Sequence, residues 1–464
     1  MAGIGFVLRK LSKEDNLSGI TKAYFHSAMA STGPWLMTVF ALGLVMIIGS
    51  NFAEKQELFD FRLIIIYNFA FSLVFTGPIY MIATRYLADS IHVKDVTAAT
   101  GLLITCLAIV NMIQIPISVW FYLVYANLTT AMALSSIVNF MLISTIWVLA
   151  VFLSSLKDFK DITGTFFAGL VISTICAASF ASGYGAVGVL NGFNVGLVVV
   201  AASLMARVFA EYPYPFKNPT IFLSYFRKYW ELTLSGLFYN AGVWVDKWIM
   251  WFAPEAERTP SKLLLYPNYD SAMFLAYLTI IPSMALFVFS VETNFFEKYL
   301  KFYRDIQRQA TFERIQSNHA GIIKSIIESS RNFLVLQGII CVSVILLAPR
   351  IFDFLGVNYL QIGIFRYGVL GSLFQVLLIF LTILLSYFDN RKAVLKVQMT
   401  FFFANTILTI YFMQAGFQYY GLGYCLASIL TFVVAAVIVG RYIENLPYHA
   451  FITSNTSVGK GTKA

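Results

Sequence analysis

Residues 230–252 read WELTLSGLFYNAGVWVDKWIMWF, an apolar and aromatic stretch long enough to cross a lipid bilayer. An acidic and a basic residue, Asp246 and Lys247, stand side by side near the outer third of this stretch. Charged side chains at such a depth are costly, and proteins that keep them usually turn them toward a water-filled cavity or pathway. The stretch therefore predicts a polytopic membrane protein with a polar interior, through which a substrate is moved.

The composition of the whole chain supports a membrane protein. Its 464 residues have a mean hydropathy of +0.75, and only 12% of them are charged, whereas about 25% are charged in a typical soluble domain. The net charge of +9 is explained by membrane topology, so we expect no nucleic acid as a partner. The four cysteines lie far apart in apolar runs, where buried, unpaired thiols are expected.

Twelve apolar runs have the length of a membrane-spanning helix. Lipid offers no water to unpaired backbone groups, so the runs must be helices or strands of a closed barrel, and their length without strict alternation favours helices. They cover residues 28–49, 62–83, 98–124, 134–153, 163–183, 186–207, 230–252, 271–292, 333–354, 364–388, 394–414 and 421–442. The predicted fold class is all-α, with about twelve transmembrane helices in two six-helix bundles around a central cavity.

The distribution of basic residues predicts the orientation of the spans. If the N-terminus is inside, only six of the 32 Lys and Arg residues fall in outer loops. This is a strong positive-inside signal, and the even number of spans then places both termini in the cytoplasm. We expect no cleavable signal peptide, because no apolar core precedes a small-residue cleavage site near the N-terminus.

The predicted organisation has two bundles joined by a linker. Its parts are a cytoplasmic N-terminal segment 1–27, a first bundle 28–207, a cytoplasmic linker 208–229, a second bundle 230–442 and a cytoplasmic tail 443–464. Within the second bundle, aromatic and basic residues interleave over 293–332. This pattern predicts an amphipathic helix at the inner membrane interface, and docking of a cytoplasmic partner is the alternative.

Six residues are candidates for the translocation pathway: Asp246, Lys247, Tyr239, Asn240, Trp244 and Glu292. Successive helical positions differ by about 100°, so Asp246 and Lys247 point to adjoining faces. Tyr239 then shares the face of Asp246, and Asn240 and Trp244 share that of Lys247. The competing interpretations are a structural Asp–Lys ion pair, a Lys247 side chain that reaches to the outer interface, and a solvated helix end at Glu292.

Motifs for catalysis and for cofactors are not found in the sequence. There is no glycine-rich phosphate loop of the GxxxxGK[ST] type, so we expect no ATP hydrolysis by this chain. No Cys/His cluster has the spacing of a metal site. We therefore expect no enzyme activity, no metal and no cofactor.

Three sequence segments resemble the PelG family in their order and spacing. They are MAGIGFVLRKL at 1–11, YNAGVWVDKW at 239–248 and VETNFFEKY at 291–299. PelG-like proteins belong to the bacterial Pel exopolysaccharide machinery of the inner membrane and are similar to polysaccharide flippases and MATE-like exporters. The resemblance covers the chain to about the end of the twelfth span, and it singles out Asp246, Lys247 and Glu292 within the matched segments.

The resemblance also implies a cargo and partners. The cargo would be Pel, a partly deacetylated and hence cationic amino-sugar polymer, carried across the bacterial inner membrane as it is synthesised. The partners would be a PelF-like cytoplasmic glycosyltransferase and membrane proteins similar to PelD and PelE. Two alternatives remain: a lipid-linked oligosaccharide flippase or ion-coupled exporter with Asp246 as the coupling site, and a membrane scaffold of the synthase that transports nothing.

Overall fold

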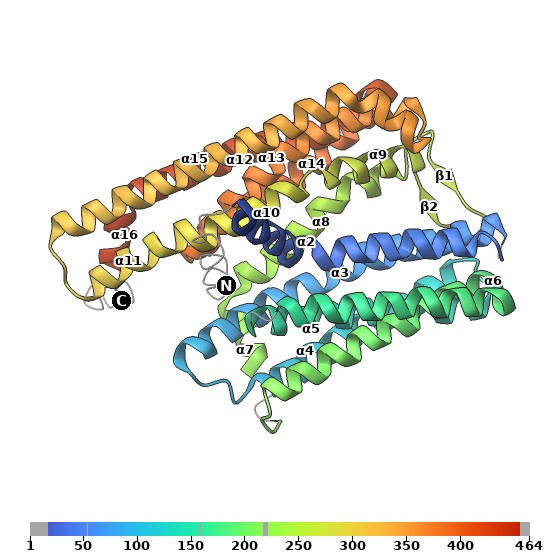
Figure 1. Cartoon of the computed structure of the whole chain (residues 1–464), viewed down its shortest axis with the longest axis horizontal. Coiled ribbons are helices and arrows are strands. Elements are labelled where there is room, and N and C mark those ends of the chain that lie inside the picture. Colours follow the sequence, from blue (N-terminus) through green and yellow to red (C-terminus); the bar gives the residue numbers. More distant parts are fainter. Residues whose placement is uncertain (1–16, 53, 157–158, 217–220, 455–464) are drawn as a thin grey trace. The chain divides into compact units, whose positions relative to one another are not determined.

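The computed structural model describes residues 17–52, 54–156, 159–216 and 221–454, which are almost entirely helical (Figure 1). Within these ranges, ten helices are long and apolar enough to cross a membrane. One of the ten, α6, contains two of the expected spans. Helix α8, whose charged residues lower its mean hydropathy, is not among them. The expected all-α, polytopic membrane fold is confirmed.

The chain divides into two compact units. The first unit is Thr32–Asp270, and the second comprises Met1–Ser31 and Ser271–Ala464. We expect a boundary at 208–229, whereas the division falls after Asp270. The reason is that helix α8, which follows the expected linker, packs along α3 inside the first unit.

The first unit is a helical bundle with one small β-hairpin. Its elements are α2 (Leu17–Gly49, from Thr32 on), α3 (Lys55–Val93), α4 (Ala99–Val119), the π-helical turn η1 (Trp120–Tyr125), α5 (Thr130–Leu156), α6 (Phe159–Glu211), α7 (Ile221–Lys228), α8 (Trp230–Met250), the antiparallel strands β1 (Glu257–Arg258) and β2 (Leu264–Leu265), and the start of α9 (Pro267–Leu278). Helices α3 and α6 both pack on α5.

Helix α6 is a helical hairpin rather than one rod. Gly185 has φ 54° and ψ −137°, a backbone conformation that side-chain-bearing residues rarely adopt, and it separates the two expected spans. Beyond it, Gly188, Gly192 and Gly196 follow at every fourth position and touch the backbone of the preceding half of α6. Small residues at this spacing let two membrane helices approach closely.

The close approach within α6 predicts a position-specific effect of adding one methyl group. A Cβ at Gly192 would lie 2.2 Å from the backbone nitrogen of Ala177, whereas a Cβ at Gly183 would meet open space. We expect Gly192→Ala to lower stability by about 1–3 kcal/mol, because the backbone cannot yield as a flexible side chain does. Gly183→Ala is the matched control, and thermal unfolding in detergent is the measurement. Equal melting temperatures for the two variants would contradict the close packing.

The second unit is also helical. Its elements are α2 up to Ser31, the remainder of α9, α10 (Ile281–Ser290), the π-helical turn η2 (Val291–Phe295), α11 (Phe296–Gln307), α12 (Phe312–Leu355), the 3-10 turn η3 (Tyr359–Gln361), α13 (Ile362–Tyr387), α14 (Arg391–Ala415), the 3-10 turn η4 (Phe417–Tyr419), α15 (Leu422–Glu444) and α16 (Leu446–Ser454). Helices α13 and α14 pack on α15, and α12 packs on α13 (Figure 1). The expected span 271–292 is interrupted at residues 279–280, just before Pro282.

The basic segment 293–332 differs from the single amphipathic helix we expect. It contains α11 and the first half of α12, which pack on each other as a hairpin. Asp305 is buried between them and accepts hydrogen bonds from Arg314 Nε and Asn318 Nδ2, each at 2.8 Å. These donors hold the pKa of Asp305 below its usual value. We call α11 and residues 312–332 of α12 the basic hairpin.

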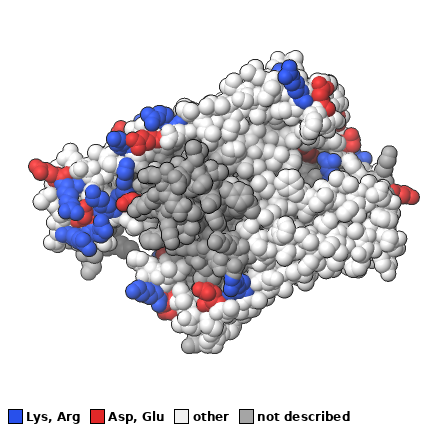
Figure 2. Space-filling model, viewed as in Figure 1, with Lys and Arg blue, Asp and Glu red and all other residues white. Residues whose placement is uncertain are grey.

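Helix α12 is too long to lie entirely within a bilayer. Its 44 residues correspond to about 66 Å, roughly twice the hydrocarbon thickness of a membrane. His319 Nε2 lies 2.7 Å from the carbonyl oxygen of Ile443, so the first turns of α12 extend past the end of α15. On the face of the second unit seen in Figure 2, charged side chains gather at its two ends, and the white surface between them, outside the grey atoms, carries almost no charge.

Candidate functional site

Two glycines bring helix α8 close to α3. A Cβ on Gly236 would lie 2.6 Å from the carbonyl oxygen of Gly77, so the two backbones nearly touch. One turn further on, Asn240 Nδ2 donates to the carbonyl oxygen of Gly236 at 2.8 Å and to the hydroxyl of Tyr80 at 3.2 Å. The structure thus places Asn240, a predicted pathway residue, in the contact between these two helices.

The neighbouring charges of α8 form a buried ion pair. Asp246 has no exposed surface, and Lys247 is 6% exposed. Lys247 Nζ lies 3.1 Å from both carboxylate oxygens of Asp246 and donates to the carbonyl oxygen of Val243 at 3.0 Å. The hydroxyl of Tyr269 donates to Asp246 Oδ2 at 2.9 Å, and Nζ also lies 5.8 Å from the Trp244 ring centroid. The Asp–Lys ion pair, the competing interpretation of these two residues, is therefore present, although adjacent helical residues point about 100° apart.

A second carboxylate, Asp270, fixes the chain that follows α8. It accepts hydrogen bonds from Trp251 Nε1 at 3.0 and 3.3 Å and from the backbone nitrogen of Tyr266 at 3.3 Å. Trp251 in turn stacks on Tyr67 of α3, with ring centroids 4.7 Å apart and an interplanar angle of 10°. The Tyr67 hydroxyl donates to the carbonyl oxygen of Leu264 and accepts from its nitrogen. Sequence reasoning did not single out Asp270, because nothing in the pattern pairs it with Trp251.

Glu231 is a further acidic residue that sequence reasoning missed. It lies in the first turn of α8, is 8% exposed, and its Oε2 is buried with no hydrogen-bond partner among the residues that the structure describes. Glu231, Ser235, Tyr239 and Asp246 occupy one arc of about 80° on the helix, and the two carboxylates are roughly 22 Å apart along its axis. We call this arc the acidic stripe. The signal in the sequence is that Ser235, Tyr239 and Asp246 follow Glu231 by 4, 8 and 15 residues, which places all four on one face of a helix.

The remaining predicted pathway residues lie on two elements. Tyr239 and Trp244 are half-buried on α8. Glu292 belongs to the π-helical turn η2, and its side chain is outside the part of the molecule that the structure describes. No group of three or more His, Cys, Asp or Glu residues that could hold a metal ion occurs among the described residues.

The first unit also contains a chain of buried amides. The Tyr122 hydroxyl donates to Asn68 Oδ1 at 2.6 Å, Asn68 Nδ2 donates to Asn139 Oδ1 at 2.8 Å, and Asn139 Nδ2 donates to Asn194 Oδ1 at 2.7 Å. Asn194 Nδ2 continues the chain to the carbonyl oxygen of Ser135 at 2.9 Å. These bonds join η1, α3, α5 and α6, so the chain contributes to helix packing.

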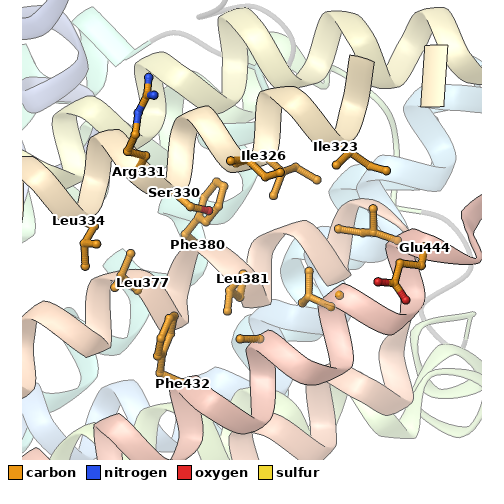
Figure 3. Close-up of a pocket in the computed structure, with 15 residues that line it drawn as sticks. Ile323, Ile326, Ser330, Arg331, Leu334, Leu377, Phe380, Leu381, Phe432 and Glu444 are labelled. Carbon is orange, nitrogen blue, oxygen red and sulfur yellow. The ribbon is translucent and has the colours of Figure 1, made fainter. Parts of the chain in front are cut away.

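An apolar groove of about 450 Å³ lies between α12, α13 and α15 of the second unit (Figure 3). Leu334, Leu377 and Phe432 are typical of its lining, and Arg331 and Glu444 are the charged residues at its edge. No predicted pathway residue belongs to it. Such a lining suits acyl chains and offers few of the polar groups that orient a sugar.

The buried pair predicts a non-additive effect on stability. We expect Asp246→Asn or Lys247→Met alone to lower the free energy of unfolding by about 3–5 kcal/mol, because each leaves a buried charge unpaired. The double variant should regain most of this loss, and thermal unfolding in detergent measures all three. Glu328→Gln, which removes an exposed ion pair with Lys324, is the control, with an expected change below about 1 kcal/mol. Additive losses in the double variant would show that the two charges do not stabilise each other.

The fold is similar to that of solved MATE and MOP superfamily transporters. A MATE structure in the bent conformation has a TM-score of 0.66 at 13% identity and covers 93% of this chain and 97% of that one. A MOP superfamily transporter from Pyrococcus furiosus has a TM-score of 0.63 at 10% identity, with 92% and 96% covered. An inward-facing multidrug resistance MATE transporter has a TM-score of 0.61 at 11% identity, with 88% and 95% covered.

A search of curated proteins finds no match to this chain. The sequence model of a family, in contrast, matches almost all of it. The model is described as "PelG: Putative exopolysaccharide Exporter (EPS-E)", and it covers residues 1–451. The three segments that carry the resemblance noted in the sequence all lie within this match. The chain belongs to the PelG family of exopolysaccharide exporters.

Proposed function

We propose that this protein carries a cationic, amino-sugar-rich polysaccharide of the Pel type across the bacterial inner membrane while the polymer is synthesised in the cytoplasm. The observation that carries the proposal is Asp246, a carboxylate with no exposed surface in an apolar helix of an exopolysaccharide exporter. Intramembrane carboxylates are rare, and those that occur commonly mark substrate or ion pathways. A carboxylate also matches the positive charge of a deacetylated amino sugar.

The positive-inside pattern supports an orientation for this path. With both termini in the cytoplasm, Glu231 stands at the cytoplasmic end of α8 and Asp246 lies toward its outer end. The acidic stripe would then offer a polymer two carboxylates in succession, roughly 22 Å apart. Between them, Ser235 and Gly242 are small, and both are buried in this conformation.

The charge of the cargo follows from the same arrangement. Clusters of basic residues on the cytoplasmic side repel a cationic polymer, so the attraction has to come from carboxylates on the path itself. In a medium of low dielectric constant this attraction is stronger than in water. An acetylated polymer lacks the ammonium groups and would gain nothing from Asp246 or Glu231.

A second candidate function is favoured by the fold. The similarity to MATE and MOP transporters suits a lipid-linked oligosaccharide flippase or an ion-coupled exporter. Asp246 would then bind the coupling ion, with substrate bound elsewhere. Both functions need Asp246, but only this one needs a sodium or proton gradient.

Transport into vesicles distinguishes these functions. We expect the purified chain, reconstituted with its glycosyltransferase, to deliver deacetylated polymer to the vesicle lumen. Asp246→Asn and Glu231→Gln should each reduce delivery about tenfold or more, since a hydrogen-bonded charge contributes about 1.5–3 kcal/mol. The exposed Glu211 supplies a control, Glu211→Gln, which should transport normally. Delivery that collapses with the ion gradient, and an Asp246→Asn variant that loses this dependence, would favour the exporter.

The basic hairpin is the proposed contact for the cytoplasmic glycosyltransferase, with PelD-like and PelE-like proteins as further membrane partners. Its charged tip extends past the end of α15, which would hold it away from the bilayer surface if α15 spans the membrane. Leu300 and Phe312 are exposed beside the exposed basic residues Arg304 and Arg308. A surface that mixes apolar and basic side chains in this way suits an acidic protein partner.

Neutralising this tip separates transport from a purely scaffolding role. The variant would carry glutamine at Lys298, Lys301, Arg304 and Arg308. We expect it to bind the glycosyltransferase weakly in a pull-down and to secrete less polymer, while vesicles loaded with preformed oligosaccharide transport normally. If secretion is abolished here but unaffected by Asp246→Asn and Glu231→Gln, the scaffold function replaces transport.

A further inference from the structure

The surroundings of Lys247 Nζ have the form of an occupied binding site for a primary ammonium group. Two carboxylate oxygens of Asp246 and the carbonyl oxygen of Val243 lie 3.0–3.1 Å from the nitrogen. An ammonium group has three N–H donors, so each donor can have an acceptor here. The Tyr269 hydroxyl, which donates to Asp246 Oδ2 at 2.9 Å, fixes the carboxylate from another side.

Stability alone does not account for this arrangement. Removing two charges from water is costly, and replacing a buried ion pair with apolar residues of similar size is often neutral or stabilising. The partners are also adjacent in sequence, so the lysine side chain has to turn back along α8 to reach Asp246 and the carbonyl oxygen of Val243. The ion pair itself lies within α8, and the bond to a second helix, α9, comes from the Tyr269 hydroxyl and not from Lys247.

We propose that Asp246, the Val243 carbonyl and Tyr269 form a binding site for the primary ammonium of a deacetylated sugar unit, and that Lys247 occupies this site until a substrate ammonium displaces it. The inference rests on the proposed function and deepens it. The exchange replaces one ammonium with another, so the carboxylate stays paired throughout.

The displaced lysine has a place to go. Lys247 lies five residues, or about 7.5 Å, before Phe252, which is 69% exposed, so a lysine side chain that extends along the helix can reach water. An N-acetylated unit carries a neutral amide at the same position and cannot replace the lysine. A quaternary ammonium lacks N–H donors, so it also fails to satisfy the three oxygens. The site thus selects sugars by the chemistry of their nitrogen.

Rescue by a small amine tests the site without any transport. Lys247→Ala removes the resident ammonium and leaves Asp246 in place. Methylammonium should raise the melting temperature of this variant by several degrees, in a saturable manner, while tetramethylammonium and sodium at equal ionic strength should not. Wild-type protein and the double variant Asp246→Asn/Lys247→Ala are the controls, and neither should respond. Equal responses of single and double variants to methylammonium would overturn the proposal.

Two further measurements keep the result decisive. If Lys247→Ala cannot be purified, Lys247→Met fills the space without a charge and should bind glucosamine oligosaccharide more tightly than wild type, and N-acetylated oligosaccharide no better. Failure to recover either variant when methylammonium is present during purification counts against the site. If methylammonium stabilises Lys247→Ala but the wild-type protein delivers no polymer to vesicles, the ammonium site stands and the proposed cargo is wrong. If polymer is delivered but methylammonium has no effect, the ammonium site alone is wrong.

Discussion

The structure depends on the cost of holding charge away from water. Asp246 and Lys247 lie in a helix that is otherwise apolar, and neither can keep its charge there without the other. The surrounding groups serve that pair: Tyr269 holds the carboxylate, and a carbonyl of α8 completes the surroundings of the ammonium. We propose that exchange with a charged cargo, and not packing alone, accounts for this pair in a membrane helix.

The elements that follow directly from hydrophobic periodicity were predictable. Long apolar runs specify membrane helices, and even the two spans within α6 could be read on either side of Gly185. The division of the chain into units was not predictable in the same way. It depends on the contact of α8 with α3 through Gly77 and Gly236, and such a contact between two glycines leaves no periodic signal.

The candidate site was predictable in its charges and not in its surroundings. An aspartate beside a lysine inside an apolar run is visible in the sequence. Tyr269, which bonds Asp246, and Asp270, which bonds Trp251, lie past a β-hairpin and come close only through the fold. The sequence does not single out Glu231, because its burial and the lack of a hydrogen-bond partner for its Oε2 among the described residues are tertiary properties. The interleaved aromatic and basic residues of the basic hairpin are visible in the sequence. The packing of α11 on α12 is not.

The continuity of α12 has a mechanical consequence. A rigid helix of 44 residues, about 66 Å long, acts as a lever: tilting it by about 10° moves its far end by roughly 11 Å. A partner that grips the tip beside Phe312 would therefore exert torque on the apolar half that ends at Leu355. A load on the basic hairpin and the tilt of the apolar half of α12 would then be coupled through one helix.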